Sequence, residues 1–147
     1  MTKLTGGCQC GQLRYEVRGE PLGAYCCHCT QCQTQSGSAF GMSLIVAWPD
    51  WHVTEGEVTT WSRTTERGTT TICHFCATCG TRVMHERAGN TTRVTLKAGT
   101  LDDTSGLHVA GHMWVSSAQP WLRPLLRGPL VFEEQPPDIL VFSSWTK

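Results

Sequence analysis

Cysteines are the residues of this chain best suited to chemistry, and they lie close together in the sequence. Nine of the 147 residues are cysteine, and they fall in three segments: GGCQCG (6–11), YCCHCTQC (25–32) and CHFCATCG (73–80). Thiolates spaced by one or two residues are typical ligands of zinc. An odd number of cysteines argues against the alternative, a secreted protein whose cysteines are all paired in disulfides. We therefore expect the cysteines to bind metal.

The first and third segments together provide four thiolates for a closed zinc site. One residue separates Cys8 from Cys10, two separate Cys76 from Cys79, and Gly80 allows the chain to reverse behind the last ligand. Two short turns that each contribute two sulfurs form a common structural zinc site. Such a site would close a long loop and stabilise a small domain. A redox dithiol or inert core thiols are the alternatives.

The middle segment contributes three more candidate ligands, Cys27, Cys29 and Cys32. Three protein ligands with a vacant fourth position are typical of catalytic zinc, because the vacancy admits water or substrate. Three thiolates on zinc leave a net charge of about −1, which favours holding and activating another thiolate. A closed structural site is the alternative, and its fourth ligand could be Cys26, His28 or Cys73. Spacing alone leaves both possibilities open.

Two histidines and one polar segment are weaker candidates for a site. His28 lies between two candidate ligands, so we expect its side chain to point away from the metal and to act as a polar neighbour. For His112 we favour a structural role over acid–base chemistry. The segment QSGSAF (35–40) is predicted to turn the chain into the next strand rather than to line a pocket.

Paired carboxylates and tryptophans have ordinary structural explanations. Asp102 and Asp103 lie in LDDTSG, which is typical turn sequence, and we interpret both as turn residues. Trp114 and Trp121 are interpreted as core or loop-anchoring residues, since no basic cluster alternates with them to form a platform for stacking bases.

Length and charge exclude several classes of partner. The 147 residues suit a single domain, 1–147, and lysine plus arginine equal aspartate plus glutamate, so the formal net charge is zero. Without a basic run we expect no nucleic-acid binding and no membrane binding. The first residues lack the apolar stretch of a signal peptide, so we expect a cytoplasmic protein. The oligomeric state is not predicted.

Hydrophobic residues alternate with polar ones in several segments, which indicates strands. The clearest are QLRYEV (12–17), AFGMSLIVAW (39–48), TTRVTLKAG (91–99) and HMWVSS (112–117). The threonine-rich stretch 57–73 predicts two strands with a turn at Gly68. No window of a dozen residues has helical periodicity, and the proline-rich C-terminal third is expected to wrap the sheet irregularly. The sequence predicts a mainly β, mostly antiparallel fold with little helix.

The motifs resemble those of the family of glutathione-dependent formaldehyde-activating enzymes, also called the centromere protein V/Gfa family. The resemblance rests on five pieces that occur in the family's order across most of the chain: GGCQCGQLRYEV (6–17), CHCTQCQTQSGSAF (27–40), FCATCGT (75–81), AGTLDD (98–103) and HMWVSSAQPW (112–121). It implies the Mss4-like fold, with antiparallel sheets around two zinc positions. It also implies that Cys8, Cys10, Cys76 and Cys79 hold structural zinc and that Cys27, Cys29 and Cys32 hold catalytic zinc.

The resemblance further implies a zinc-dependent carbon–sulfur lyase that acts on a small thiol or its aldehyde adduct. The founding members are described as adding glutathione to formaldehyde to give S-hydroxymethylglutathione, so the expected partners are a thiol such as glutathione and formaldehyde. A non-catalytic, zinc-stabilised binding module is the alternative, and the family's chromosome-associated relatives suggest it. The coordination of the second metal would distinguish the two functions.

Overall fold

The computed structural model describes residues 3–143 and confirms the predicted mainly β fold. It contains ten strands in two sheets and one α-helix in this part of the chain. The strands are β1 (Lys3–Gly7), β2 (Arg14–Arg18), β3 (Gly23–Cys27), β4 (Gly41–Ala47), β5 (Trp51–Glu55), β6 (Thr59–Thr64), β7 (Thr70–Phe75), β8 (Arg82–Arg87), β9 (Arg93–Lys97) and β10 (Gly111–Met113). The helix is α1 (Thr30–Ser36), and the short 3-10 turns are η1 (Trp48–Asp50), η2 (Ala98–Thr100), η3 (Val115–Ser117), η4 (Arg123–Leu125) and η5 (Ile139–Phe142).

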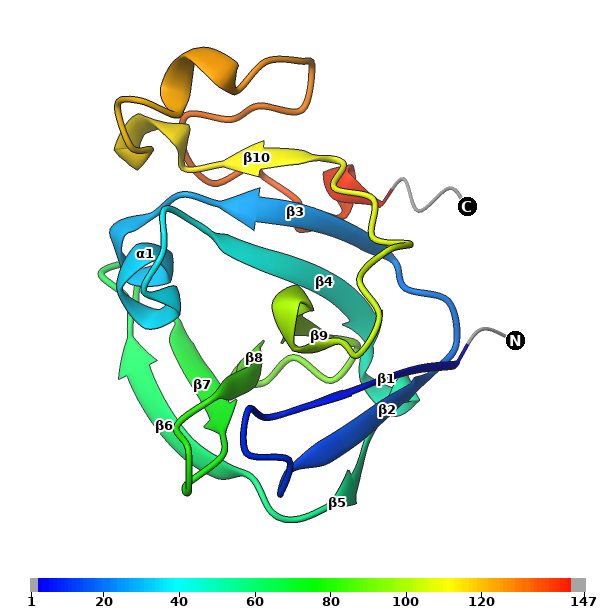
Figure 1. Ribbon diagram of the computed structural model, residues 1–147. Helices are drawn as coiled ribbons and strands as arrows, with labels where there is room; N and C mark the ends of the chain where they lie inside the picture. The colour runs from blue at the N-terminus through cyan, green and yellow to red at the C-terminus, as the bar shows by residue number, and fades with distance from the viewer. Residues whose placement is uncertain (1–2, 144–147) are drawn as a thin grey trace.

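The smaller sheet has the order β1-β2-β5 and the larger one the order β10-β3-β4-β9-β8-β7-β6. Neighbouring strands are antiparallel except β10 and β3, which are parallel. Figure 1 shows α1 beside the ends of β3 and β4, and the yellow-to-red C-terminal chain running outside β10. That chain is held to β10 by a parallel bridge between His112 and Val131, so the irregular C-terminal third predicted from its prolines is present.

Two clusters of buried side chains form the core. The first lies between the sheets and includes Leu44, Val46, Leu96 and, from the cysteine segments, Cys8 and Cys76. The second includes Tyr25, Cys27, Ile45, Met113 and Phe142, with Cys29 and Cys32 packed against it. The cysteines of the first and third segments therefore pack in the first cluster, and those of the middle segment pack in the second.

Most strands occur where the sequence predicts them, and two differ in detail. Strand β4 was predicted to bury every second residue, but the consecutive residues Leu44, Ile45 and Val46 are all fully buried. It pairs with β3 and β9 and contributes to a core cluster on each face, which produces a continuous apolar run rather than an alternating pattern. The strand predicted at 112–117 ends at Met113, because Trp114 has a φ of 58° and η3 follows.

The predicted turn at Gly68 is confirmed: it lies between β6 and β7 and has a φ of 80°, a value that favours glycine. Across residues 3–143, no helix has the length and apolar character needed to cross a membrane.

Candidate metal centre

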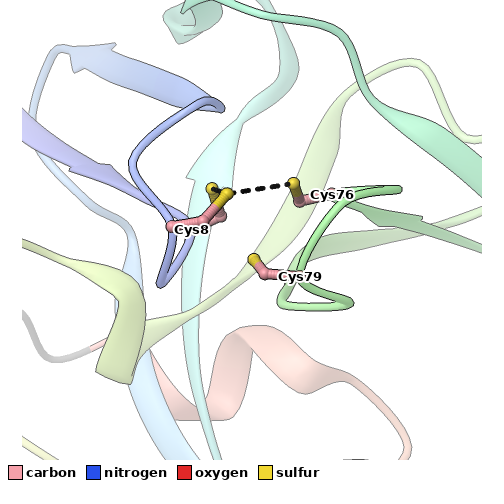
Figure 2. A group of neighbouring side chains, drawn as sticks. Cys8, Cys76 and Cys79 are labelled. Atoms are coloured by element: carbon pink, nitrogen blue, oxygen red, sulfur yellow. Dashed lines mark hydrogen bonds between the residues drawn. The ribbon is translucent and has the colours of Figure 1, made fainter.

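Four of the predicted ligands come together at one point between the sheets. The sulfurs of Cys8, Cys10, Cys76 and Cys79 all lie within 4.8 Å of one another. The sulfurs of Cys8 and Cys10 are 3.5 Å apart, and those of Cys10 and Cys76 are 3.8 Å apart. A zinc ion with four thiolates at about 2.3 Å requires sulfurs roughly 3.8 Å apart, so the group fits zinc. Figure 2 shows Cys8 on one loop facing Cys76 and Cys79 on another.

Each of these loops is a tight turn between two strands. In the β1–β2 loop, the amide of Leu13 donates to the sulfur of Cys8 at 3.2 Å. In the β7–β8 loop, the amide of Gly80 donates to the carbonyl of Cys76 at 2.8 Å. Gly80 has a φ of 79°, as the predicted reversal behind Cys79 requires.

Hydrogen bonds also join the two loops without any metal. The amide of Gln9 donates to the hydroxyl of Thr81 at 3.1 Å, and the hydroxyl of Thr78 donates to the side-chain oxygen of Gln12 at 2.9 Å. The hydroxyl of Thr81 is also 3.3 Å from the sulfur of Cys79, and this contact lowers the pKa of that thiol to about 5. These hydrogen bonds therefore help to hold the two cysteine loops together.

The middle segment forms a second group at the end of β3. The sulfurs of Cys27, Cys29 and Cys32 lie within 4.8 Å of one another. Cys29 is the N-cap of α1, and its sulfur accepts a hydrogen bond from the amide of Cys32 at 3.3 Å. The first turn of α1 thus brings the sulfurs of Cys29 and Cys32 beside that of Cys27, which lies at the end of β3.

None of the three candidates for a fourth ligand joins this group. Among residues 3–143, the ligating atoms of Cys26, His28 and Cys73 lie outside both cysteine groups. Cys26 is adjacent to Cys27 in β3, so the two side chains point to opposite faces of the sheet. The geometry of the described residues therefore gives three sulfurs and no fourth protein ligand.

The three sulfurs of the second group also share protons unequally. The pKa of Cys29 is lowered to about 2, mainly because the thiols of Cys27 and Cys32 donate hydrogen bonds to its sulfur. The pKa of Cys27 is raised, mainly because its thiol donates a hydrogen bond to the sulfur of Cys29. The group therefore favours at least one thiolate, which is the form that binds a cation.

His28 points away from the three sulfurs, as predicted. Its ring is fully buried beside Phe40, and its Nε2 lies 3.0 Å from Nδ1 of His112. Burial lowers the pKa of both histidines, that of His28 to about 4. The two residues are a neutral, packed pair directly behind the cysteine group.

Lys97 is a buried residue near the second group that the sequence analysis did not identify. It lies at the end of β9 and is only 8% exposed. Burial lowers its pKa, whereas the nearby Cys32 and Cys27 have the opposite effect. The only sequence signal was a lysine at the end of a predicted strand, and nothing in the sequence shows that this face is covered.

The remaining predicted residues have mixed outcomes. Asp103 is a turn residue as predicted, because its carboxylate accepts from the amide of Ser105. Asp102 also lies at a bend of the chain, but its carboxylate forms an ion pair with Arg14 and accepts from the hydroxyl of Thr5 instead of bonding to the backbone of the turn.

The tryptophans and the segment 35–40 are likewise divided. Trp114 packs against the second core cluster and donates to Gln135, as expected of an anchor, whereas Trp121 is 66% exposed and is not a core residue. Gly37 ends α1 with a φ of 59°, which confirms the turn, but Gln35 also lines a pocket.

Fold and site together define a class: a mainly β protein with two cysteine groups, one of four and one of three, that could hold metal ions. The family profile described as glutathione-dependent formaldehyde-activating enzyme (GFA) matches residues 3–117. The chain belongs to this family.

Comparison with solved structures supports the fold. A crystal structure of a Rhodobacter sphaeroides protein is 22% identical in sequence, with a TM-score of 0.54, and the match covers 87% of this chain and 98% of that one. At this identity the likeness concerns the fold alone. No curated protein matches the chain.

Proposed function

We propose that the protein is a zinc-dependent carbon–sulfur lyase that acts on a small thiol or its aldehyde adduct, with glutathione and formaldehyde as the candidate pair. The observation that carries this proposal is the group of Cys27, Cys29 and Cys32, to which no other side chain among residues 3–143 adds a fourth ligand. The family match supports the choice of substrates. We further propose that the protein is one domain and acts in the cytoplasm, where a thiol substrate stays reduced.

The two cysteine groups have different proposed roles. Cys8, Cys10, Cys76 and Cys79 would hold a structural zinc ion, because four sulfurs complete its coordination. Cys27, Cys29 and Cys32 would hold the catalytic ion. Zinc bound there would supply Lewis acidity that lowers the proton affinity of a substrate thiol.

The chain's own residues favour a thiolate at this position. Lys97 places a positive charge near Cys32 and Cys27, and a nearby cation stabilises any sulfur anion. Cys27 is 3% exposed and belongs to the second core cluster, so water has little access from that side. The helix turn at Cys29 leaves the other side of the group facing α1 and the segment that follows it.

The test is to add glutathione and formaldehyde to the zinc-loaded protein and to measure the rate of hemithioacetal formation by exchange NMR. We expect a rate above the spontaneous one, and we expect Cys32→Ala to abolish the increase. Cys26→Ala is the matched control, because it removes a neighbouring buried cysteine outside the group. Two zinc ions with no rate increase and no thiol bound to metal would instead support the non-catalytic binding module.

A further inference from the structure

One face of the larger sheet gathers cationic side chains next to the second cysteine group. Strand register places Trp61 opposite Cys73, Cys73 opposite His85, and His85 opposite Thr95, so these four side chains share a face. Residues two positions away along each strand have the same orientation. This rule places Arg63 on β6, His85 and Arg87 on β8, and Arg93 and Lys97 on β9 on this face. The register shift after His74 pairs Arg82 with Phe75, which is two positions after Cys73, and so brings Arg82 onto the same face.

The same register connects this face to the cysteines. Lys97 is opposite Ser43 on β4, and Ser43 is opposite Tyr25 on β3. Cys27 lies two positions after Tyr25 and therefore shares the face with Lys97. The electrostatic influence of Cys27, Cys32 and Arg82 on Lys97 agrees with this placement.

Three of these cations, Arg63, Arg82 and Lys97, have no carboxylate partner within residues 3–143. None of the ion pairs of that part of the chain includes Arg63, Arg82 or Lys97. Lys97 is more than nine-tenths buried, and the acidic groups near it are cysteine thiols rather than carboxylates. Since the formal net charge of the chain is zero, this positive charge is a local feature and suits an anionic ligand.

Of these cations, Arg82 lines a pocket of about 280 Å³, together with Gln35, Trp61, Phe75 and Gly80. The guanidinium of Arg82 lies 5.9 Å from the centre of the Trp61 ring, which is a cation–π contact that orients it. Gln35 connects the pocket to the cysteines through Gly41: a Cβ at Gly41 would lie 3.3 Å from Nε2 of Gln35 and 3.7 Å from the sulfur of Cys32.

We propose that Arg82 and Lys97 bind a carboxylate of the substrate thiol and make the protein selective for thiols that carry one. The inference rests on the proposed function, since it assumes that the sulfur of the same molecule reaches the Cys27 group. Arginine suits this role because its planar guanidinium can donate two hydrogen bonds to one carboxylate. A neutral thiol of similar size would leave the guanidinium of Arg82 without a carboxylate partner.

The test uses S-methylglutathione, whose sulfur is blocked but whose carboxylates are free, and its diester, in which both carboxylates are neutralised. Calorimetric titration of the zinc-loaded protein should show binding of the free acid about tenfold tighter than binding of the diester. Arg82→Gln and Lys97→Met should each weaken binding of the free acid about tenfold and leave that of the diester unchanged. Arg87→Gln, at the exposed end of the same strand, is the matched control and should change neither.

Fluorescence locates the ligand. Binding of the free acid should change the emission of Trp61, and the change should be absent in Trp61→Phe. Equal affinities for acid and diester, or full affinity for the acid in Arg82→Gln, would overturn the proposal. Because the blocked sulfur cannot react, a protein that binds S-methylglutathione without catalysing hemithioacetal formation would refute the proposed reaction and retain the carboxylate site. Catalysis of hemithioacetal formation without tighter binding of the free acid would support the proposed reaction and refute the carboxylate site.

Discussion

The sulfur of Cys10 lies 3.8 Å from that of Cys76, although 66 residues separate the two in the chain. Cys10 is in the loop of the smaller sheet, and Cys76 begins a loop of the larger one. A metal held by this group would therefore join the two sheets. Its loss should affect the stability of the whole protein.

Removing one structural ligand is the first test. Cys76→Ser should reduce the bound zinc from two ions to one and lower the free energy of unfolding by at least about 3 kcal/mol, because a buried ligand network is broken. For a chain of this length, that loss corresponds to a fall in melting temperature of roughly 10 °C. Zinc analysis and thermal unfolding measure the two effects. Cys73→Ala, a buried cysteine outside both groups, should retain both ions.

The hydroxyl of Thr81 should stabilise the protein independently of metal. Thr81→Val removes the acceptor of the Gln9 amide and the contact with the sulfur of Cys79, so we expect a loss of about 1–2 kcal/mol. Chemical denaturation with and without a chelator measures it. Thr78→Val, which removes an exposed hydrogen bond to Gln12, should cost less. A Thr81→Val protein as stable as the wild type after chelation would contradict the role of the hydroxyl.

Lys97 should stabilise the ligand complex while destabilising the free protein. Its charge is buried without a carboxylate partner, and burial lowers its pKa more than the nearby thiols raise it, so Lys97→Met should raise the free energy of unfolding by about 1–2 kcal/mol while weakening ligand binding. Urea unfolding measures the stability. Arg87→Gln again serves as the control, with a change within about 0.5 kcal/mol. A less stable Lys97→Met protein would show that the lysine has a structural role.

Acid should destabilise the fold in part through His85. Desolvation lowers the pKa of His85 well below its ordinary 6.5, and Lys97, Arg82, Arg63 and His74 add to the effect. Below about pH 6.5 the unfolded chain binds a proton at this residue that the folded chain does not, so stability is lost as the pH falls.

Comparison of unfolding free energies at about pH 7.5 and about pH 5.5 measures this contribution. His85→Gln should lose about 1 kcal/mol less than the wild type over this range, whereas the exposed His108→Gln should match the wild type. An identical pH dependence in His85→Gln and wild type would contradict the assignment.

Local sequence predicted much of the fold because its signals act over a few residues. Period-two alternation located β2 and β9, the threonine-rich stretch located β6 and β7, and the glycines at 68 and 80 marked turns that require a positive φ. The α-helix was not located individually. With seven residues, α1 is too short to show periodicity, and it forms around the cysteine at its N-cap.

The sequence by itself determined which cysteines could act together, because spacings of one and two residues place sulfurs on one side of a turn. It could not decide whether Cys26, His28 or Cys73 completes the second group, and the prediction of a single domain stays a prediction. Only the tertiary structure decided about the fourth ligand. Strand alternation in β3 directs Cys26 away from the three sulfurs, the packing against His112 does the same for His28, and Cys73 lies outside the group. Likewise, the burial of Lys97 and the ion pair of Asp102 with Arg14 depend on strands far apart in the chain, whose pairing no local pattern reveals.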